Sequence, residues 1–244
     1  MLPWWFQYYS AHFEVEDIFV LHHTVPSAAH DPCTDHLPSA CNVINVSNEY
    51  FDPVWLREVV CQQQRALLES YNIVLFAEVD EIIVPDRRFY PTGLQGYLSA
   101  FARGEQLAVR CTGWELHHNI AASEPAVDLG RPLLTQRGFW HRNELYDKAL
   151  VTQQPLQYGL GFHTCEQAVD RDDGLLLLHL HKYDFNSYLR RHEERAVMRH
   201  SDDAIRNGWN EHYRRSGGQL VAQFLSIPSP LEPLPEWLKE SNVV

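Results

Sequence analysis

The feature that most constrains the fold is an apolar run that leads directly into three carboxylates, in the segment VLFAEVDEIIVPD at residues 74–86. Residues 72–79 read as apolar on both faces, which is typical of a central parallel strand covered by helices. Because side chains two apart on a strand point the same way, Glu78 and Asp80 are expected to share a face and Glu81 to point away. Ligands bind beyond the carboxyl ends of strands in open α/β sheets, so the pattern predicts a ligand site at Asp80.

The rest of the chain alternates strands with helices in its first half and crowds strands into its second half. This order predicts an α/β fold with a mixed, mostly parallel sheet flanked by helices. Residues 227–244 hold prolines at 228, 230, 233 and 235, and predict an extended tail packed along the surface of a single domain, residues 1–226. The predicted helices span residues 2–13, 52–71, 94–104 and 186–209, and the predicted strands span 17–23, 42–47, 72–79, 106–118, 147–153 and 174–184.

Charge and composition disfavour some classes of function. The 20 basic and 32 acidic residues give a net charge of −12, which repels phosphate backbones and disfavours nucleic-acid binding. Five cysteines without a CxxC pair fit a reducing, cytoplasmic compartment. Trp4, Trp5 and Phe6 could make a peripheral contact with the inner face of the membrane, but a helix face packed in the core is the favoured interpretation.

The acidic segment has the chemistry of a cation site. Two carboxylates on one face at a strand end can hold Mg²⁺ or Mn²⁺; the alternative is that they cap a neighbouring loop. His179 and His181 lie two apart in a predicted strand, so one imidazole could complete the site, and His163 in a turn flanked by glycine is another candidate. The alternative for each is a hydrogen-bonded core histidine.

Taken with its neighbours, the segment YNIVLFAEVDEIIVPD resembles the motif Y-x-x-V-L-F-x-D-x-D-E of family-2-like glycosyltransferases with a GT-A fold, in particular small bacterial members. The segments at residues 2–13 and 50–71, and the blocks YDKALV, GFHT and LLLLHLHKYD, resemble family segments in the same order. The resemblance covers most of residues 1–200. It implies a GT-A-like (Rossmann-like) fold, a nucleotide-sugar donor, and Mn²⁺ or Mg²⁺ bridging the donor diphosphate. It also implies transfer of the sugar, in a hexosyltransferase-like reaction, to a glycan or another hydroxyl acceptor.

Residue by residue, the resemblance puts Glu78 and Asp80 at the two acidic places of the family's DxD motif. Glutamate is longer by one methylene, so Asp80 is expected to bind the metal directly and Glu78 through water. Glu81 is expected to have a structural role or to contact the acceptor. Lys148 and Arg65 are expected to bind the donor, Lys148 by neutralising the diphosphate; the alternative for Lys148 is a solvated lysine at a strand edge.

An inverting transfer also needs a general base that deprotonates the acceptor hydroxyl. Glu115 is the preferred candidate, because it ends the strand that follows the acidic motif. Asp80 is the other residue expected to be catalytic, and the remaining candidates for the base are Glu144, Asp147 and Asp172.

One departure from the family pattern concerns the start of the chain. Family members begin with a strand and a short loop that help to hold the nucleotide base, whereas this chain begins at the following helix. We therefore expect either an incomplete base pocket or a true start upstream. The favoured hypothesis is a metal-dependent glycosyltransferase; the alternatives are a catalytically weak nucleotide- or glycan-binding homologue and a metal-dependent phosphohydrolase.

Overall fold

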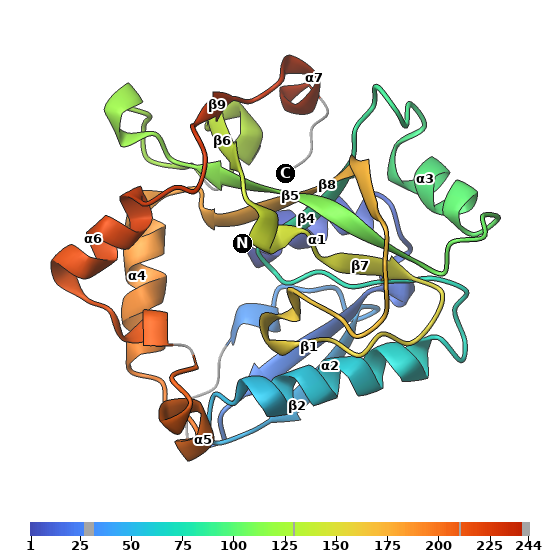
Figure 1. The fold of residues 1–244 in the computed structure, drawn as a ribbon, viewed down its shortest axis with the longest axis horizontal. Coiled ribbons are helices and arrows are strands. Elements are labelled where there is room, and N and C mark those ends of the chain that lie inside the picture. The colour runs from blue at the N-terminus through green and yellow to red at the C-terminus, as the bar shows by residue number, and fades with distance from the viewer. Residues whose placement is uncertain (27–31, 129, 210, 241–244) are drawn as a thin grey trace.

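The computed structural model describes residues 1–26, 32–128, 130–209 and 211–240, and it shows an α/β fold with two sheets (Figure 1). The small sheet pairs β1 (Phe19–Thr24) with β2 (Asn42–Ser47) in parallel. The large sheet contains β3 (Val74–Leu75), β4 (Glu81–Pro85), β5 (Ala108–His117), β6 (Phe139–Arg142), β7 (Ala149–Thr152), β8 (Arg171–Lys182) and β9 (Glu232–Pro233). The helices are α1 (Leu2–Ser10), α2 (Pro53–Leu67), α3 (Gly93–Phe101), α4 (Phe185–Ala196), α5 (Asp202–Arg206), α6 (Gly217–Leu225) and α7 (Glu236–Lys239).

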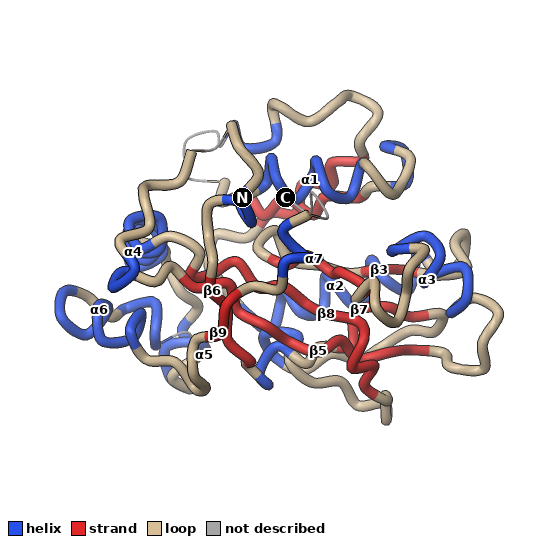
Figure 2. The backbone as a smooth tube through the Cα atoms, turned by 90° about the horizontal axis from the view of Figure 1, so that it is seen from above, coloured by secondary structure: helices blue, strands red, loops and turns tan. Residues whose placement is uncertain are grey.

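The large sheet is organised around β5. One edge of β5 pairs with β8, and the other edge pairs with β7 and then β6; β4 pairs with β8, β3 with β7 and β9 with β6. Within the described residues only β5 and β8 are parallel in this sheet, so the prediction of a mostly parallel sheet is wrong. A continuous apolar run reports that both faces of a strand are covered, and it does not fix the direction of the neighbouring strand. The helices flank this mixed sheet, with α4 and α6 at one end and α3 at the other (Figure 2).

Helix α2 forms where capping chemistry predicts it. The Oδ1 atom of Asp52 accepts hydrogen bonds from the backbone N–H groups of Val54 (2.8 Å) and Trp55 (3.1 Å), and Pro53 occupies the first turn. The helix predicted over residues 186–209 is instead split into α4 and α5. The split occurs because Ser201 caps α5, its Oγ accepting from the Ala204 N–H at 3.2 Å.

The strand predicted over residues 72–79 is also corrected. Regular pairing in this segment is limited to β3, and the chain then turns before β4 begins at Glu81. The Glu81 N–H donates to the Glu78 carbonyl at 2.9 Å, and the Glu81 carboxylate accepts from the Glu78 N–H at 3.0 Å. Carboxylates that bond nearby backbone groups favour turns over strands. The expected alternation of side chains therefore does not hold from Glu78 to Glu81.

Helix α1 lies against β4. The Tyr8 hydroxyl donates to the Ile83 carbonyl at 2.7 Å, and the Ile83 N–H donates to the Tyr9 hydroxyl at 3.1 Å. Trp4 is buried, and Trp5 and Phe6 pack against the same core, which fits the core-packing interpretation of this aromatic helix. None of the helices among the described residues combines the length and the apolar character needed to span a bilayer.

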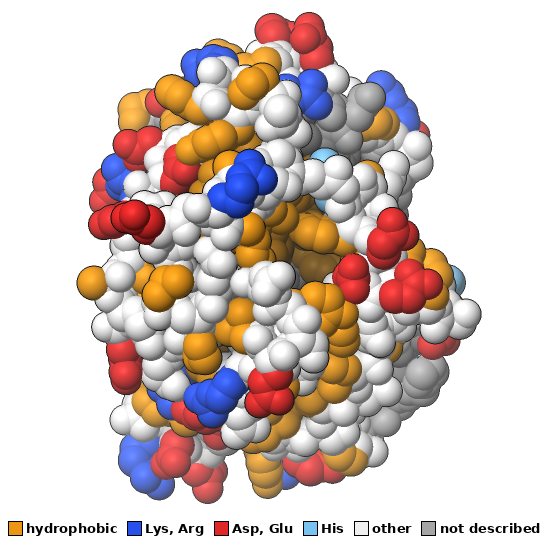
Figure 3. All heavy atoms as spheres, turned by 90° about the vertical axis from the view of Figure 1, so that its right-hand side faces the viewer, with side chains coloured by type: hydrophobic (Ala, Val, Ile, Leu, Met, Phe, Trp, Pro, Cys, Tyr) orange, Lys and Arg blue, Asp and Glu red, His pale blue; other side chains and the backbone are white. Residues whose placement is uncertain are grey.

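The C-terminal segment is more integrated than a surface tail. Strand β9 pairs with β6, and Leu234 and Leu238 are buried in the main core. Strands β4, β6 and β9 and helices α6 and α7 were not predicted. The face at the right of Figure 1 is hollowed, and hydrophobic side chains form the floor of the hollow (Figure 3).

Candidate metal centre

Three potential metal ligands meet where the acidic turn crosses β8. Asp80 Oδ2 lies 3.7 Å from His179 Nε2 and 3.8 Å from His181 Nδ1. One ligand atom from each residue lies within 4.8 Å of the other two. The turn places Asp80 there because the Leu180 N–H, between the two histidines, donates to the Asp80 carbonyl at 2.7 Å.

The three side chains are electrostatically coupled. Burial alone would raise the pKa of Asp80, but a hydrogen bond from His181 and the charge of His179 lower it well below its usual value. Burial lowers the pKa of His181. Burial also acts to lower the pKa of His179, but Glu115 and Asp80 raise it above its ordinary value. A carboxylate that stays ionised beside two imidazoles is a competent donor set for a divalent cation.

Glu115 orients His179. Its Oε1 lies 3.2 Å from His179 Nδ1, which leaves Nε2 facing Asp80. The carboxylate is buried and is also contacted by His141 at 3.3 Å and by Asn143 at 3.4 Å. Burial would raise the pKa of Glu115, but the hydrogen bonds from His141 and His179 lower it well below its usual value. A carboxylate that binds the second nitrogen of a metal-ligating histidine fixes the tautomer and orientation of the ring.

Two further side chains hold the histidines. The Tyr146 ring stacks on His179, with centroids 3.7 Å apart and an interplanar angle of 25°. His181 Nε2 lies 3.2 Å from His192 Nε2, so its Nδ1 faces Asp80. Sequence reasoning missed both residues. Tyr146 opens the block YDKALV, but its stacking on His179 depends on a contact between distant segments, and His192 gives no local signal because its partner lies on another element.

Lys148 forms a second, adjoining charged cluster. Its Nζ lies 2.6 Å from Glu78 Oε2 and 2.5 Å from Glu81 Oε1, and the lysine side chain is 1% exposed. Burial alone would lower the pKa of Lys148, but the two glutamates raise it above its ordinary value. The alternative of a solvated lysine is therefore wrong. The side chains of Glu78 and Glu81 both point to the Lys148 ammonium group, whereas the sequence predicted that they point in opposite directions.

The remaining predicted site residues lie elsewhere. Of the five residues predicted as metal ligands, Glu78 is held by Lys148, and His163 Nδ1 contacts the Leu145 carbonyl at 2.6 Å, so neither joins the Asp80, His179 and His181 cluster. Arg65 is exposed near the end of α2, where no contact to the cluster is seen among the described residues.

The other candidates for the general base also differ in environment. Asp147 binds Arg142 at 2.6 Å and the Gly113 N–H at 2.8 Å, and Asp172 accepts from the Tyr90 hydroxyl at 2.5 Å. Glu144 is exposed. Glu115 is too enclosed to meet an acceptor directly, which makes it a positioning residue for His179 in this geometry.

Two nitrogens and one carboxylate oxygen form a mixed donor set. Mg²⁺ prefers oxygen ligands, whereas imidazole suits first-row transition metals, so the set fits Mn²⁺ better than Mg²⁺. Three protein ligands also leave coordination positions for water or a bound ligand. Comparison of the chain with protein-family models, with curated proteins and with solved structures finds no match.

Proposed function

We propose that the protein is a divalent-metal-dependent glycosyltransferase that takes a sugar from a nucleotide-sugar donor to a hydroxyl acceptor. The observation that carries the proposal is the cluster of Asp80, His179 and His181. Asp80 lies in the acidic segment and the two histidines lie in the block LLLLHLHKYD. Both segments resemble motifs of family-2-like glycosyltransferases. Their meeting in space is independent of the resemblance and supports the same site.

The chain's own residues have separable roles in this proposal. Asp80, His179 and His181 hold a cation, Mn²⁺ in preference to Mg²⁺, and Glu115 and Tyr146 orient His179. The cation, when bound, neutralises the donor diphosphate and its departing charge. Lys148 lies beside the cluster, but two carboxylates, Glu78 and Glu81, bind it, so it holds the acidic turn in place and adds no net positive charge. A GT-A-like topology belongs to the same proposal, and the mixed sheet flanked by helices supports it at the level of fold class.

The donor set disfavours one alternative. A metal-dependent phosphohydrolase that uses these acids would need a dense carboxylate cluster, and Asp80 is the single carboxylate among the three ligands. The other alternative, a homologue that binds nucleotide or glycan without turnover, has the same site and must be separated by assay.

The test is a thermal-shift panel of nucleoside diphosphates and nucleotide sugars, with and without Mn²⁺. A ligand at a hundred times its dissociation constant adds about 2.7 kcal/mol to the free energy of unfolding, which is large enough to raise the melting temperature measurably. Because the cation is proposed to bind the donor diphosphate, we expect a matching donor to raise the melting temperature only when Mn²⁺ is present. Asp80→Asn should abolish this shift, and Asp170→Asn, which changes an exposed aspartate, should preserve it. The absence of any Mn²⁺-dependent shift would remove the donor-binding proposal. Release of nucleoside diphosphate from the matching donor, in the presence of hydroxyl acceptors, then separates an enzyme from a binding homologue.

A further inference from the structure

A pocket lies on the face of the large sheet that is turned away from the metal centre. In the pairing of β5 with β8, Glu115 is opposite His179 and Thr112 is opposite Leu176. Side chains alternate along a strand, so Thr112, Trp114 and Leu176 point to the other face from Glu115 and His179. The pocket has a volume of about 440 Å³, within the range of small-molecule sites.

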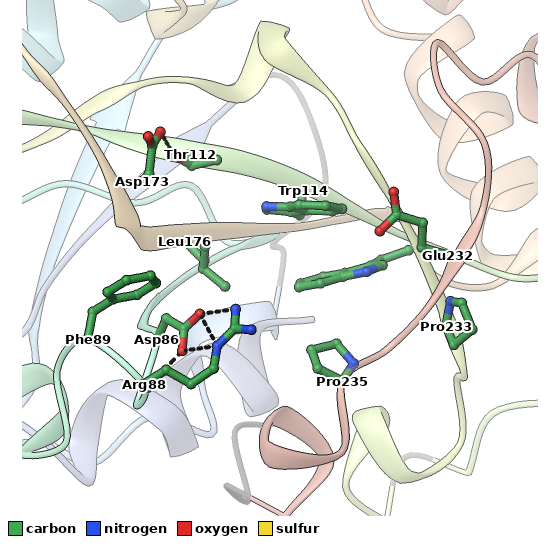
Figure 4. A pocket seen from close by; sticks show the side chains of 11 residues that line it. Asp86, Arg88, Phe89, Thr112, Trp114, Asp173, Leu176, Glu232, Pro233 and Pro235 are labelled. Atoms are coloured by element: carbon green, nitrogen blue, oxygen red, sulfur yellow. Dashed lines mark hydrogen bonds and ion pairs between the residues drawn. The ribbon is translucent and has the colours of Figure 1, made fainter.

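Aromatic rings and the C-terminal segment build the walls of this pocket (Figure 4). Trp114 and Trp140 stack with centroids 4.1 Å apart and an interplanar angle of 21°. Trp140 is 6% exposed, so the pair is held rigidly by the core, whereas Phe89 is 65% exposed at the rim. Glu232, Pro233 and Pro235 close the opposite side, which gives the integrated C-terminal segment a place in a site.

The polar groups of the pocket include both donors and acceptors. Arg88 forms a forked ion pair with Asp86, at 2.5 Å from Nη2 and 3.0 Å from Nε, while the Arg88 side chain stays 68% exposed. Thr112 contributes a hydroxyl, and Asp173 and Glu232 contribute two further carboxylates. With three carboxylates against one guanidinium, the formal charge of the lining is negative, which repels phosphates and other anions.

The ligand that meets these conditions is neutral, rich in hydroxyls and apolar on one face. A ligand hydroxyl can donate to Glu232 or Asp173 and can accept from Arg88. The Thr112 hydroxyl donates to the Asp172 carbonyl at 3.1 Å, so it serves the ligand as an acceptor. A sugar ring also presents a face of C–H groups, which packs on the negative face of an aromatic ring. A simple cation would suit the aromatic rings and the carboxylates, but it offers no hydrogen-bond acceptor for the N–H groups of Arg88.

We propose that this pocket, lined by Trp114, Phe89, Arg88 and Glu232, binds a neutral carbohydrate at a site separate from the metal centre. The inference does not rest on the proposed transferase activity, because it is carried by residues on the other face of the sheet.

The test is a titration of the full chain, in the presence of EDTA, with glucose, galactose, mannose, N-acetylglucosamine and short oligomers of each. The readout is the indole N–H signals in ¹H–¹⁵N spectra, with the Trp114 and Trp140 signals assigned from conservative Trp→Phe variants. We expect saturable shifts of these two signals, with a dissociation constant on the order of 1 mM for at least one sugar. Choline and inorganic phosphate serve as the cationic and anionic probes.

Two exposed positions allow variants that preserve the core. Glu232→Gln should weaken sugar binding roughly tenfold, because it removes a charge-assisted hydrogen bond, and Phe89→Ala should also weaken it. Glu105→Gln, which changes an exposed glutamate outside the pocket, and Asp80→Asn should leave it unchanged. The proposal is overturned if no sugar gives a saturable shift, if choline or phosphate binds in place of sugar, or if Asp80→Asn abolishes binding while Glu232→Gln does not.

Discussion

The Leu180 N–H donates to the carbonyl oxygen of Asp80 at 2.7 Å, and this backbone bond aligns the acidic turn with β8. The residues on either side of Leu180 are the two histidines of the metal centre. Both histidines point to the same face of β8 because they are two residues apart on the strand. The backbone bond to Leu180 places the Asp80 carboxylate beside both imidazole rings. The cluster therefore depends on the register of one turn against one strand.

The first prediction ranks the acids by their contact with the cluster. Asp80→Asn should weaken Mn²⁺ binding most, because it removes the one carboxylate ligand. Glu78→Gln should do much less, because Glu78 is bound to Lys148 at 2.6 Å. Calorimetric titration with Mn²⁺ measures both affinities. Equal losses in the two variants would show that Glu78 is a ligand on a par with Asp80, contrary to its pairing with Lys148.

The same turn shows what the sequence could and could not predict. The residues of the cluster were predicted individually, because acids after an apolar run and histidines two apart in a strand are local patterns. The grouping was predicted only in part: the strand expected through residue 79 ends at Leu75, and Glu78 turns to Lys148 in place of the metal site. The turn is formed by hydrogen bonds between Glu78 and Glu81, and these bonds compete with strand pairing. Residue propensities do not show whether the turn or the strand is the more stable.

Fold prediction succeeded where a local signal was strong. The Asp52 cap with Pro53 located the start of α2, and the apolar run from Leu175 to Leu178 located β8. The direction of strand pairing, the short strand β6 and the burial of Leu238 depend on contacts between distant segments, which no local pattern encodes.

A second prediction tests Glu115 as the residue that positions His179. Glu115→Gln keeps the size of the side chain and removes the charge that holds His179 Nδ1 at 3.2 Å. Loss of such an outer partner typically costs 10–100-fold in metal affinity, so Mn²⁺ affinity should fall by roughly that factor. The matched control is Asp172→Asn, which changes a carboxylate bound by Tyr90 outside the metal centre. Unchanged Mn²⁺ affinity in Glu115→Gln would assign Glu115 to stability alone.

A third prediction concerns the buried Lys148 cluster. Lys148→Met leaves Glu81, which is fully buried, without its cation, so the free energy of unfolding should fall by about 3–5 kcal/mol. Lys239→Met is the control, because Lys239 forms an exposed pair with Glu236 at 2.8 Å and should change stability by less than about 1 kcal/mol. Chemical denaturation of the two variants at pH 7 makes the comparison. Similar small losses would mean that water reaches Glu81 and that the cluster is not a buried ion pair.

A fourth prediction tests whether the C-terminal segment belongs to the core. Leu238 is fully buried, so Leu238→Ala should lower the free energy of unfolding by about 2–5 kcal/mol. Leu225→Ala, at a leucine that is 57% exposed, should cost less than about 1 kcal/mol. Both variants are compared by denaturant titration. A loss at Leu238 no larger than at Leu225 would restore the interpretation of residues 227–244 as a surface tail.

The last prediction uses the buried imidazole of His117. The pKa of His117 is lowered from 6.5 to about 4, mainly by burial; Lys182, His141 and His118 also lower it, and Glu115 opposes them. At pH values between 6.5 and about 4, His117 binds a proton in the unfolded chain but not in the folded chain. The stability that comes from keeping His117 neutral is therefore fully present above pH 6.5 and is lost as the pH falls towards 4.

At pH 5 the protonation of His117 in the unfolded chain lowers the free energy of unfolding by about 2 kcal/mol at most, because pH 5 is about 1.5 units below the unfolded pKa and each unit is worth about 1.4 kcal/mol. Asn cannot titrate in this range, so His117→Asn should lose less stability between pH 7.5 and pH 5 than the natural chain loses. Denaturant unfolding at both pH values gives, for each protein, the change in the free energy of unfolding between pH 7.5 and pH 5. Any pH-independent loss of stability caused by the substitution cancels when the two values of one protein are subtracted. An equal loss in both proteins would show that His117 is protonated in the folded state, and that the acid sensitivity of the fold arises from other groups.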